Sequence, residues 1–300
     1  MFSGINAIEF AKRFCSNEAC IQYLEEQKWK SGYHCKACGC QCYIKGKTGY
    51  HRRCQQCGYD ESVTANTLFH DIRMPMIKAF YMAFRITSKK KGMSTVELAA
   101  EVGVQQKTAW LFKRKMQLAM KQSLSAKLVG NVEVDEFTVG GRQKDHYGRK
   151  TGKKKATLIA VEHLGDGKVG NIHIEPIENF KADTLKYAIK SGVADSAQIK
   201  TDDYQSYKTL SGEMKIERIP SNKGENFKEL HNQIMLFKNW LRGIHHKCSN
   251  TLYFAYCDEY SFRFNRRNNR KAIFASLIKA MLHSNPHPKS ILKTLRAYST

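Results

Sequence analysis

The chain is 300 residues long and strongly basic, with 50 Lys and Arg residues against 27 Asp and Glu residues and a formal net charge of +23. Its length suits two or three small domains, and a mean hydropathy of −0.53, without any run of ~20 apolar residues, argues against a membrane-spanning protein. The charge favours a polyanionic partner, because each neutralised phosphate releases condensed counterions. A ribosomal or membrane-surface protein would also be basic, but neither would explain the acidic residues inside the apolar strands described below.

The N-terminal region, residues 1–70, is expected to combine short helices with a zinc ribbon. The chain does not open on the apolar core of a signal peptide, so no secretory signal is predicted. Eight of the ten cysteines precede position 58. Clustered cysteine pairs in such a chain indicate metal binding in a reducing compartment instead of disulfides.

Two CxxC pairs, separated by 15 residues, are the basis of the zinc prediction. Two thiolates three positions apart can bind one side of a tetrahedral ion, and a hairpin brings the second pair round. The predicted zinc ligands are Cys35, Cys38, Cys54 and Cys57. Because these four fill every coordination position, the zinc is expected to be structural. Cys40 and Cys42 remain open as replacements for one of the four.

Residues 71–125 are expected to be helical and to contain a DNA-binding helix-turn-helix. The predicted helices cover 75–87, 94–102 and 105–121. Gly103 lies at the turn between the last two, four residues after the small Ala99, which lets two helices cross closely. The residues expected to contact DNA, through bases or phosphates, are Gln105, Gln106, Lys107, Thr108, Lys113 and Arg114. A helical linker without DNA contacts is the alternative.

From residue 126 onward the pattern changes to alternating strands and helices. The predicted strands cover 131–139, 156–163, 169–177, 197–202 and 215–220. The predicted helices cover 181–191, 204–210, 225–242, 250–264 and 271–283. This order indicates a mixed α/β layer fold for residues 126–285, followed by a C-terminal tail at 286–300.

Carboxylates interrupt two of these apolar strands. Asp135 and Glu133 share one face of the first strand, and Glu136 lies on the other. Asp202 ends the fourth strand. A carboxylate inside an apolar strand is costly unless it binds a partner, and nucleotidyl transfer uses carboxylates from separate strands to hold two divalent ions ~4 Å apart. Two aspartates alone are weak support for this chemistry, because Asp commonly ends strands.

Several motifs occur together in one order: VEVDEFTVGGR, IKTDDYQSYKTL, FKNWLRGIHH and DEYSFRFNRR, after CQQCGYDESVTANTLF and KTAWLFKRKMQLAM. This order resembles bacterial insertion-sequence transposases of the IS-fifteen-ninety-five family, which are ISXO-like and DDE-type, over nearly the whole chain. The resemblance implies an RNase H-like fold. It also implies a DNA transposase that binds terminal inverted repeats, cleaves the transposon ends and joins their 3′ ends to target DNA by two-metal phosphoryl transfer.

The resemblance also implies roles for single residues. Asp135 matches the first catalytic aspartate, Asp202 the second and Lys238 the lysine of the third motif. His231 occupies the place, seven residues before that lysine, where an acidic residue is usual, and two helical turns put both on one face. Asp135, Asp202 and His231 are therefore the expected ligands of Mg²⁺ or Mn²⁺, and the imidazole favours Mn²⁺.

Alternatives remain for two of these ligands. Glu225 or Glu229 would replace His231 if the helix had another register, and Asp203 would replace Asp202. A later E-x3-R-x2-R motif is matched by Glu259, Arg263 and Arg266. These three share one helical face and are expected to act as an ion-paired brace or a phosphate clamp.

The implied partners are double-stranded DNA, at the transposon ends and the target, and further copies of the chain. No membrane partner is expected, and the implied location is the bacterial cytoplasm, in association with the nucleoid. The basic stretch 149–155 fits either a solvated run of charge or contact with phosphates. The main alternative function is a domesticated or inactive relative that acts as a sequence-specific DNA-binding regulator. A nuclease of the same fold that joins no strands is a further alternative.

Overall fold

The computed structural model describes residues 4, 6–124, 126–141, 152–245 and 248–287. The chain divides into two compact units. The first contains Met1–Gln122 together with Asn268–Thr300, and the second contains Ser123–Arg267. Within the described residues, no helix is both long enough and apolar enough to cross a bilayer.

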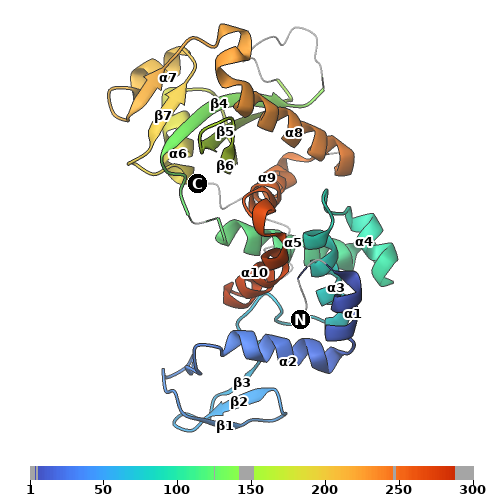
Figure 1. The fold of residues 1–300 in the computed structure, drawn as a ribbon. Helices are drawn as coiled ribbons and strands as arrows, with labels where there is room; N and C mark the ends of the chain where they lie inside the picture. Colours follow the sequence, from blue (N-terminus) through green and yellow to red (C-terminus); the bar gives the residue numbers. More distant parts are fainter. Residues whose placement is uncertain (1–3, 5, 125, 142–151, 246–247, 288–300) are drawn as a thin grey trace. The chain divides into compact units, whose positions relative to one another are not determined.

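The first unit consists of six helices and a small sheet among its described residues (Figure 1). The helices are α1 (Ala7–Arg13), α2 (Asn17–Lys28), α3 (Met76–Ser88), α4 (Thr95–Val102), α5 (Gln106–Gln122) and α10 (Arg270–His283). The antiparallel strands are β1 (Tyr43–Lys45), β2 (His51–Cys54) and β3 (Asp60–Ser62). These elements match the helices and the cysteine-rich hairpin that the sequence predicts.

Aromatic side chains form much of the buried core of this unit. Phe10 of α1 stacks on Phe84 of α3, with ring centroids 4.4 Å apart. The ring centroid of Phe14 lies 5.0 Å from that of Phe80 and 5.6 Å from that of Phe274 in α10. Aromatic pairs in such tilted and offset geometries add to the free energy gained by burying their area. The three helices therefore share one core.

Helix α10 belongs to this first unit, although the sequence pattern predicts one domain over residues 126–285. It packs against α2, α3 and α5, and the carbonyl of Met281 accepts a hydrogen bond of 3.0 Å from the Leu68 backbone N–H. The apolar residues of α10 would suit either core. Its sequence therefore shows that the helix is buried but not which partner buries it.

The second unit contains a mixed five-stranded sheet with the order β6-β5-β4-β7-β8. The strands are β4 (Asn131–Val139), β5 (Lys155–His163), β6 (Val169–Pro176), β7 (Gln198–Thr201) and β8 (Ile216–Arg218). β4 pairs antiparallel with β5 and parallel with β7. The five strands agree with the predicted ones, which confirms the mixed α/β class.

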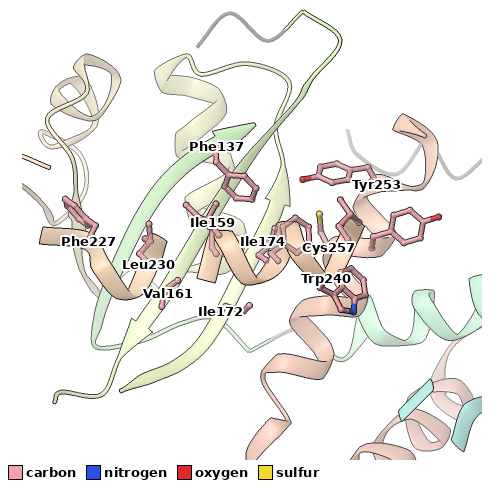
Figure 2. Close-up of a cluster of buried hydrophobic side chains, with 14 residues drawn as sticks. Phe137, Ile159, Val161, Ile172, Ile174, Phe227, Leu230, Trp240, Tyr253 and Cys257 are labelled. Atoms are coloured by element: carbon pink, nitrogen blue, oxygen red, sulfur yellow. The ribbon is translucent and has the colours of Figure 1, made fainter. Parts of the chain in front are cut away.

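Helices cover both faces of this sheet. α6 (Ala182–Gly192) and α7 (Gln205–Leu210) bury one face, which contains Val132 and Val134 of β4. The short 3-10 helix η1 (Asn222–Phe227), α8 (Lys228–Ile244) and α9 (Asn250–Phe264) bury the other. Figure 2 shows this second cluster, in which Phe137 of β4 and Ile159 of β5 pack with side chains of α8 and α9.

The alternation of β4 therefore gives its two sets of side chains different surroundings. Even-numbered Val132 and Val134 face α6 and α7, and odd-numbered Phe137 faces α8. Since successive side chains of a strand point to opposite faces, Glu133 and Asp135 lie on the α8 face. Glu136 lies on the α7 face.

Candidate functional site

The four predicted zinc ligands gather into one cluster. The ligand atoms of Cys35, Cys38, Cys54 and Cys57 all lie within 4.8 Å of one another. The Sγ atoms of Cys35 and Cys57 are 3.5 Å apart, as are those of Cys38 and Cys54. Ligands at the usual Zn–S length of about 2.3 Å in a tetrahedron stand about 3.8 Å apart. The cluster is therefore compatible with a structural zinc ion.

The local backbone explains why each pair is followed by glycine. Gly39 and Gly58 come directly after the two CxxC pairs and have φ values of +77° and +72°, a region that favours glycine. Their backbone N–H groups donate to the carbonyls of Cys35 and Cys54, at 2.9 and 3.0 Å. The pKa of the Cys54 thiol is lowered to about 6, first by hydrogen bonding with the Cys57 backbone. The turn that follows Cys54 thus favours the thiolate form of this one residue.

Cys40 and Cys42 lie beside this cluster and outside it. The Cys40 carbonyl accepts a hydrogen bond of 2.9 Å from the Cys35 backbone N–H. The Cys42 backbone N–H donates to the Cys40 Sγ, at 3.4 Å. All ten cysteines are free of disulfides. The Cys40 thiol and the backbone of both residues therefore support the turn beside the four cysteines that gather.

The ribbon is joined to α2 by buried charges. Lys28 and Glu61 form an ion pair of 2.8 Å with side chains only 8% and 1% exposed. The Lys28 ammonium also donates to the carbonyls of Ser62 and Ala65. The Arg52 guanidinium lies 4.2 Å from the ring centroids of both Trp29 and Tyr43. These contacts fix the small sheet to the helical part of the first unit.

The two predicted catalytic aspartates lie on neighbouring parallel strands. β4 and β7 pair with a constant offset of 67 residues, as in Glu133 with Lys200. The pairing ends at Glu133 and Lys200, and each aspartate lies two residues beyond that last pair. Asp202 follows directly on the end of β7, whereas Asp135 lies within β4. Two carboxylates 67 positions apart in sequence thus follow the same end of the β4–β7 pairing.

One oxygen of each carboxylate is held by the backbone. Asp135 Oδ1 accepts a hydrogen bond of 2.7 Å from the Glu136 N–H. Asp202 Oδ1 accepts one of 3.1 Å from the Tyr204 N–H. Each bond restricts the rotation of its carboxylate. Both aspartates are therefore oriented by neighbours in their own strand or loop.

His231 of α8 contacts the first aspartate directly. Its Nε2 lies 3.3 Å from Asp135 Oδ2, and the hydrogen bond to Asp135 raises the pKa of the imidazole against the opposing effect of burial. The negative charges of Glu133 and Asp202 raise it further. Gly224 lies against the ring, since a Cβ there would stand 2.8 Å from Nδ1. The kink before α8 therefore requires a residue without a side chain.

Asp135, Asp202 and His231 are less closely grouped than the four cysteines of the cluster. Among the described residues, the cysteine cluster is the only set of three or more metal-binding side chains whose ligand atoms all lie within 4.8 Å of one another. Asp135 and His231 contact each other directly, with Nε2 and Oδ2 3.3 Å apart.

Lys238 lies further along the same face of α8. Its ammonium is 5.0 Å from the ring centroid of Phe137, two residues after Asp135 in β4. Burial lowers the pKa of this lysine, with Arg242 as the next cause, while the charge of Asp135 opposes the shift. The Lys238 ammonium thus lies over an aromatic ring, within reach of the charge of Asp135, and forms no direct ion pair with that carboxylate.

The structure distinguishes the alternative ligands by where they lie. Asp203 pairs with Arg218 of β8 at 3.4 Å, and 58% of its side chain is exposed. Glu229 influences His163, whose pKa is raised first by a hydrogen bond to Glu133 and also by the charge of Glu229. Glu225 is exposed in η1. None of these three has the direct contact with Asp135 that His231 has.

Two groups near the aspartates were not singled out in the sequence as site residues. Glu133 forms an ion pair of 3.0 Å with His163 of β5. Tyr207 of α7 is completely buried, and its hydroxyl donates a hydrogen bond of 2.6 Å to Glu136 Oε2. The signal for Glu133 and Glu136 was present in β4 as acidic residues among apolar ones. Tyr207 resembles an ordinary core aromatic in the sequence.

The predicted accessory residues lie along α9 and just after it. Glu259 is buried, Arg263 is half-buried, and Arg266 stacks on Phe262 with its guanidinium 4.0 Å from the ring centroid. Arg266 also donates to the carbonyls of Phe262 and Ser123, at 3.2 Å each. Burial lowers its pKa. Arg266 therefore braces the backbone of the second unit.

The predicted DNA-binding helices form a tight pair. Ser94 and Glu97 make a capping box at the start of α4. Gly103 ends that helix in the left-handed region, with φ +64°, a common conformation at helix C-termini and one that favours glycine. Gln105, Gln106 and Lys107 at the start of α5 are exposed, and Thr108 is partly so. These four residues present a polar surface at one end of the helix.

Lys113 and Arg114, which are also predicted to contact DNA, do not share that surface. They are 2% and 3% exposed. The Lys113 ammonium donates to the Met93 carbonyl at 2.9 Å, and Arg114 donates to Gln117 Oε1 at 2.9 Å. Long basic side chains bury their apolar stems readily, so their position on a helix does not by itself make them surface cations. Of the basic stretch 149–155, residues 149–151 lie outside the described residues.

Comparison with known proteins gives a consistent result for the second unit. Residues 127–265 match the family described as the ISXO2-like transposase domain, and this segment is nearly the whole of Ser123–Arg267. The chain is also similar to a protein of Halobacterium salinarum described as an uncharacterized protein in transposable element ISH50. The two are 24% identical over 215 residues, which cover 66% of this chain and 71% of the relative.

Proposed function

We propose that this chain, which belongs to the ISXO2-like transposases through residues 127–265, is a DNA transposase that cuts and joins transposon ends. It binds terminal inverted repeats, cleaves beside them and joins the 3′ ends to target DNA. The proposed fold of the second unit is RNase H-like. The observation that supports the proposal is that Asp135 lies in β4 and Asp202 directly follows β7, the parallel neighbour of β4, with His231 in contact with Asp135.

Asp135, Asp202 and His231 are the proposed ligands of the catalytic Mg²⁺ or Mn²⁺. Such ions activate a water or a 3′-hydroxyl and stabilise the leaving oxygen. The carboxylates fit this role because each has one oxygen fixed by a backbone N–H. His231 fits it only after losing the proton that it shares with Asp135. The imidazole makes Mn²⁺ the better fit.

Lys238 is the proposed contact for the phosphate next to the scissile bond. Its ammonium is half-buried over Phe137, and the charge of Asp135 acts on it. A cation held in this way can meet a phosphate without first breaking an ion pair with an aspartate. Glu259, Arg263 and Arg266 are proposed to support the helix that follows, since Arg266 binds backbone carbonyls.

The first unit is proposed to bind the DNA ends. Its α4–α5 pair acts as a helix-turn-helix, with Gln105, Gln106, Lys107 and Thr108 toward the DNA. The four-cysteine cluster holds a structural zinc that stabilises the ribbon. Because two ends must be joined, the active form is at least a dimer, and its place of action is DNA in the bacterial cytoplasm.

A supercoiled donor plasmid that carries the inverted repeats flanking the coding DNA tests this function. The wild-type chain, with zinc and either Mn²⁺ or Mg²⁺, is expected to produce cleaved ends and joined products. Asp135→Asn and Asp202→Asn should abolish both products. Asp203→Asn is the matched control, because Asp203 is adjacent in sequence but pairs with Arg218, and it should leave both products in place.

A DNA-binding regulator without catalysis is the second candidate. It is favoured by the separation of Asp202 from the Asp135–His231 pair. If the wild-type chain binds the ends but forms neither product in either metal, this candidate replaces the first. Cleaved ends without any joined strands would instead identify a nuclease.

A further inference from the structure

The buried phenol of Tyr207 lies where the backbone pairing of two strands comes to an end. The parallel pairing of β4 with β7 covers Asn131–Glu133 on the β4 side, and β7 ends at Thr201. Asp135 and Asp202 both lie beyond those pairs. The Tyr207 hydroxyl donates to Glu136 Oε2 at 2.6 Å, so a side-chain bond connects β4 to the segment after β7.

The two aspartates stand at the two ends of this connection. On β4, the N–H of Glu136 donates to Asp135 Oδ1. On the other side, the N–H of Tyr204 donates to Asp202 Oδ1, and Tyr204 is the N-cap of α7, the helix that carries Tyr207. One residue therefore holds each aspartate, and the Glu136–Tyr207 bond fixes those two holding segments to each other.

We propose that Tyr207 and Glu136 are positioning residues that set the separation of the Asp135 and Asp202 carboxylates for divalent-metal binding. This inference rests on the proposed function, because it concerns the same site. Neither side chain touches the ion or the DNA. Both act through the segments that orient the aspartates, in the way that the neighbours of a metal ligand commonly set its orientation and affinity.

The chemistry of the pair suits a fixed brace. A buried hydroxyl is costly unless it is hydrogen-bonded, and a phenylalanine would fill the same core without that cost. Burial raises the pKa of Tyr207 well above its ordinary value, and the charges of Glu136, Asp135 and Asp202 add to the shift. The phenol therefore remains a proton donor at the pH of any ordinary assay. The bond to a carboxylate is charge-assisted and correspondingly strong.

Tyr253 provides a matched control. Its hydroxyl also makes a buried hydrogen bond of 2.6 Å, to Thr157 Oγ1, and it lies in the same unit. Tyr253 packs in the cluster of α8 and α9, without contact to either aspartate among its hydrogen bonds and ring contacts. Tyr253→Phe therefore removes an equivalent bond without disturbing the proposed brace.

The experiment measures Mn²⁺ binding to the full, zinc-loaded chain by isothermal titration calorimetry, without DNA. Asp135→Asn defines the binding that belongs to the site. Tyr207→Phe is expected to raise the Kd for Mn²⁺ about tenfold, and Tyr253→Phe is expected to change it by less than about twofold. Equal Kd values for Tyr207→Phe and Tyr253→Phe would overturn the brace and leave the proposed function standing. If the wild-type chain has no Mn²⁺ binding that depends on Asp135, both fail.

Glu136→Gln is a second variant of the same bond if Tyr207→Phe folds poorly, and a double-variant cycle shows whether the two side chains act together. Glu136→Gln removes the charged acceptor and is also expected to weaken Mn²⁺ binding. If the two side chains act as one brace, the double variant binds no more weakly than the weaker single variant. Losses that multiply in the double variant would show that the two residues act separately, and would refute the brace.

Discussion

The imidazole Nε2 of His231 lies 3.3 Å from Oδ2 of Asp135, so two groups proposed to bind one metal ion bind each other. The contact occupies one ring nitrogen of His231 and one carboxylate oxygen of Asp135, both of them atoms that could bind a metal ion. Because a metal ion binds the neutral imidazole, metal binding at this site would depend on pH.

Mn²⁺ affinity is expected to fall as the pH is lowered, starting above the ordinary histidine pKa of about 6.5. The pKa of His231 is raised, first by its hydrogen bond to Asp135, so the imidazole is protonated over a wider range. His231→Asn offers a ligand that does not titrate, and should flatten this dependence between pH 6 and pH 8. Calorimetric Kd values at three pH values check it, and parallel curves for the two chains would contradict it.

The same pair should stabilise the metal-free protein at low pH. A raised folded-state pKa contributes stability that is fully present below the unfolded value of about 6.5 and is lost as the pH rises through the raised value. Because 42% of the His231 side chain is exposed, the effect should be only about 0.5 kcal/mol. Urea unfolding of wild type and His231→Asn, at pH 5.5 and pH 8.5, would measure it. A larger difference at pH 8.5 would reverse the assignment.

Zinc content should depend on four cysteines and not on their neighbours. Cys54→Ser removes a ligand atom from the cluster and should abolish the one equivalent of zinc expected per chain. Cys40→Ser and Cys42→Ser should retain it, since their sulfur atoms lie outside the cluster. Elemental analysis of the purified chains gives the ratio. Loss of zinc from Cys40→Ser would mean that the ligand set is wrong.

Substitutions of two lysines that lie six residues apart on α5 should have different effects on DNA binding. Lys107→Ala is expected to weaken binding to the inverted repeat and to reduce the salt slope by about 1, because an exposed cation is lost. Lys113→Met should leave the slope unchanged, because its ammonium binds the Met93 carbonyl. Fluorescence anisotropy at a series of salt concentrations distinguishes them. A reduced slope for Lys113→Met would restore that residue to the DNA surface.

Lys28 and Glu61, which form the ion pair between α2 and the ribbon, should be strongly coupled in their effect on the free energy of unfolding. Glu61→Ala leaves the Lys28 ammonium buried without its carboxylate and should lower the free energy of unfolding by roughly 3 kcal/mol. The double variant Lys28→Met with Glu61→Leu should recover much of that loss, because no unpaired charge remains buried. Denaturant unfolding of the zinc-loaded chains tests this. Equal losses for the single and double variants would mean that the charges are not coupled.

Local sequence patterns predicted most of the helices and strands, because each pattern shows which face of its own element is buried. β4 was predicted at 131–139 and is found at Asn131–Val139, since its alternation matches the two different layers above and below it. The spacing of the cysteines likewise predicted which four of them gather in the cluster. The aspartates were paired only through a family resemblance, because strand register depends on which strands are neighbours.

Other features depend on contacts that a local pattern does not encode. Tyr207 and Glu136 are 71 positions apart, and the sequence of the short helix α7 gives no sign that its tyrosine meets a carboxylate. Lys113 and Arg114 were expected at the surface from their charge alone. Their burial follows from how α5 packs, which the amphipathic pattern of one helix does not determine.

The assignment of α10 to the first unit bears on the order in which the chain folds during synthesis. A ribosome that adds about 5–20 residues per second completes Ser123–Arg267 before it makes Phe274, whose ring contacts Phe14 and Phe80. The core of the first unit therefore stays incomplete until the second unit has been synthesised. The proposed DNA-binding half would mature last, so a prematurely terminated polypeptide would lack a finished core with which to hold transposon ends.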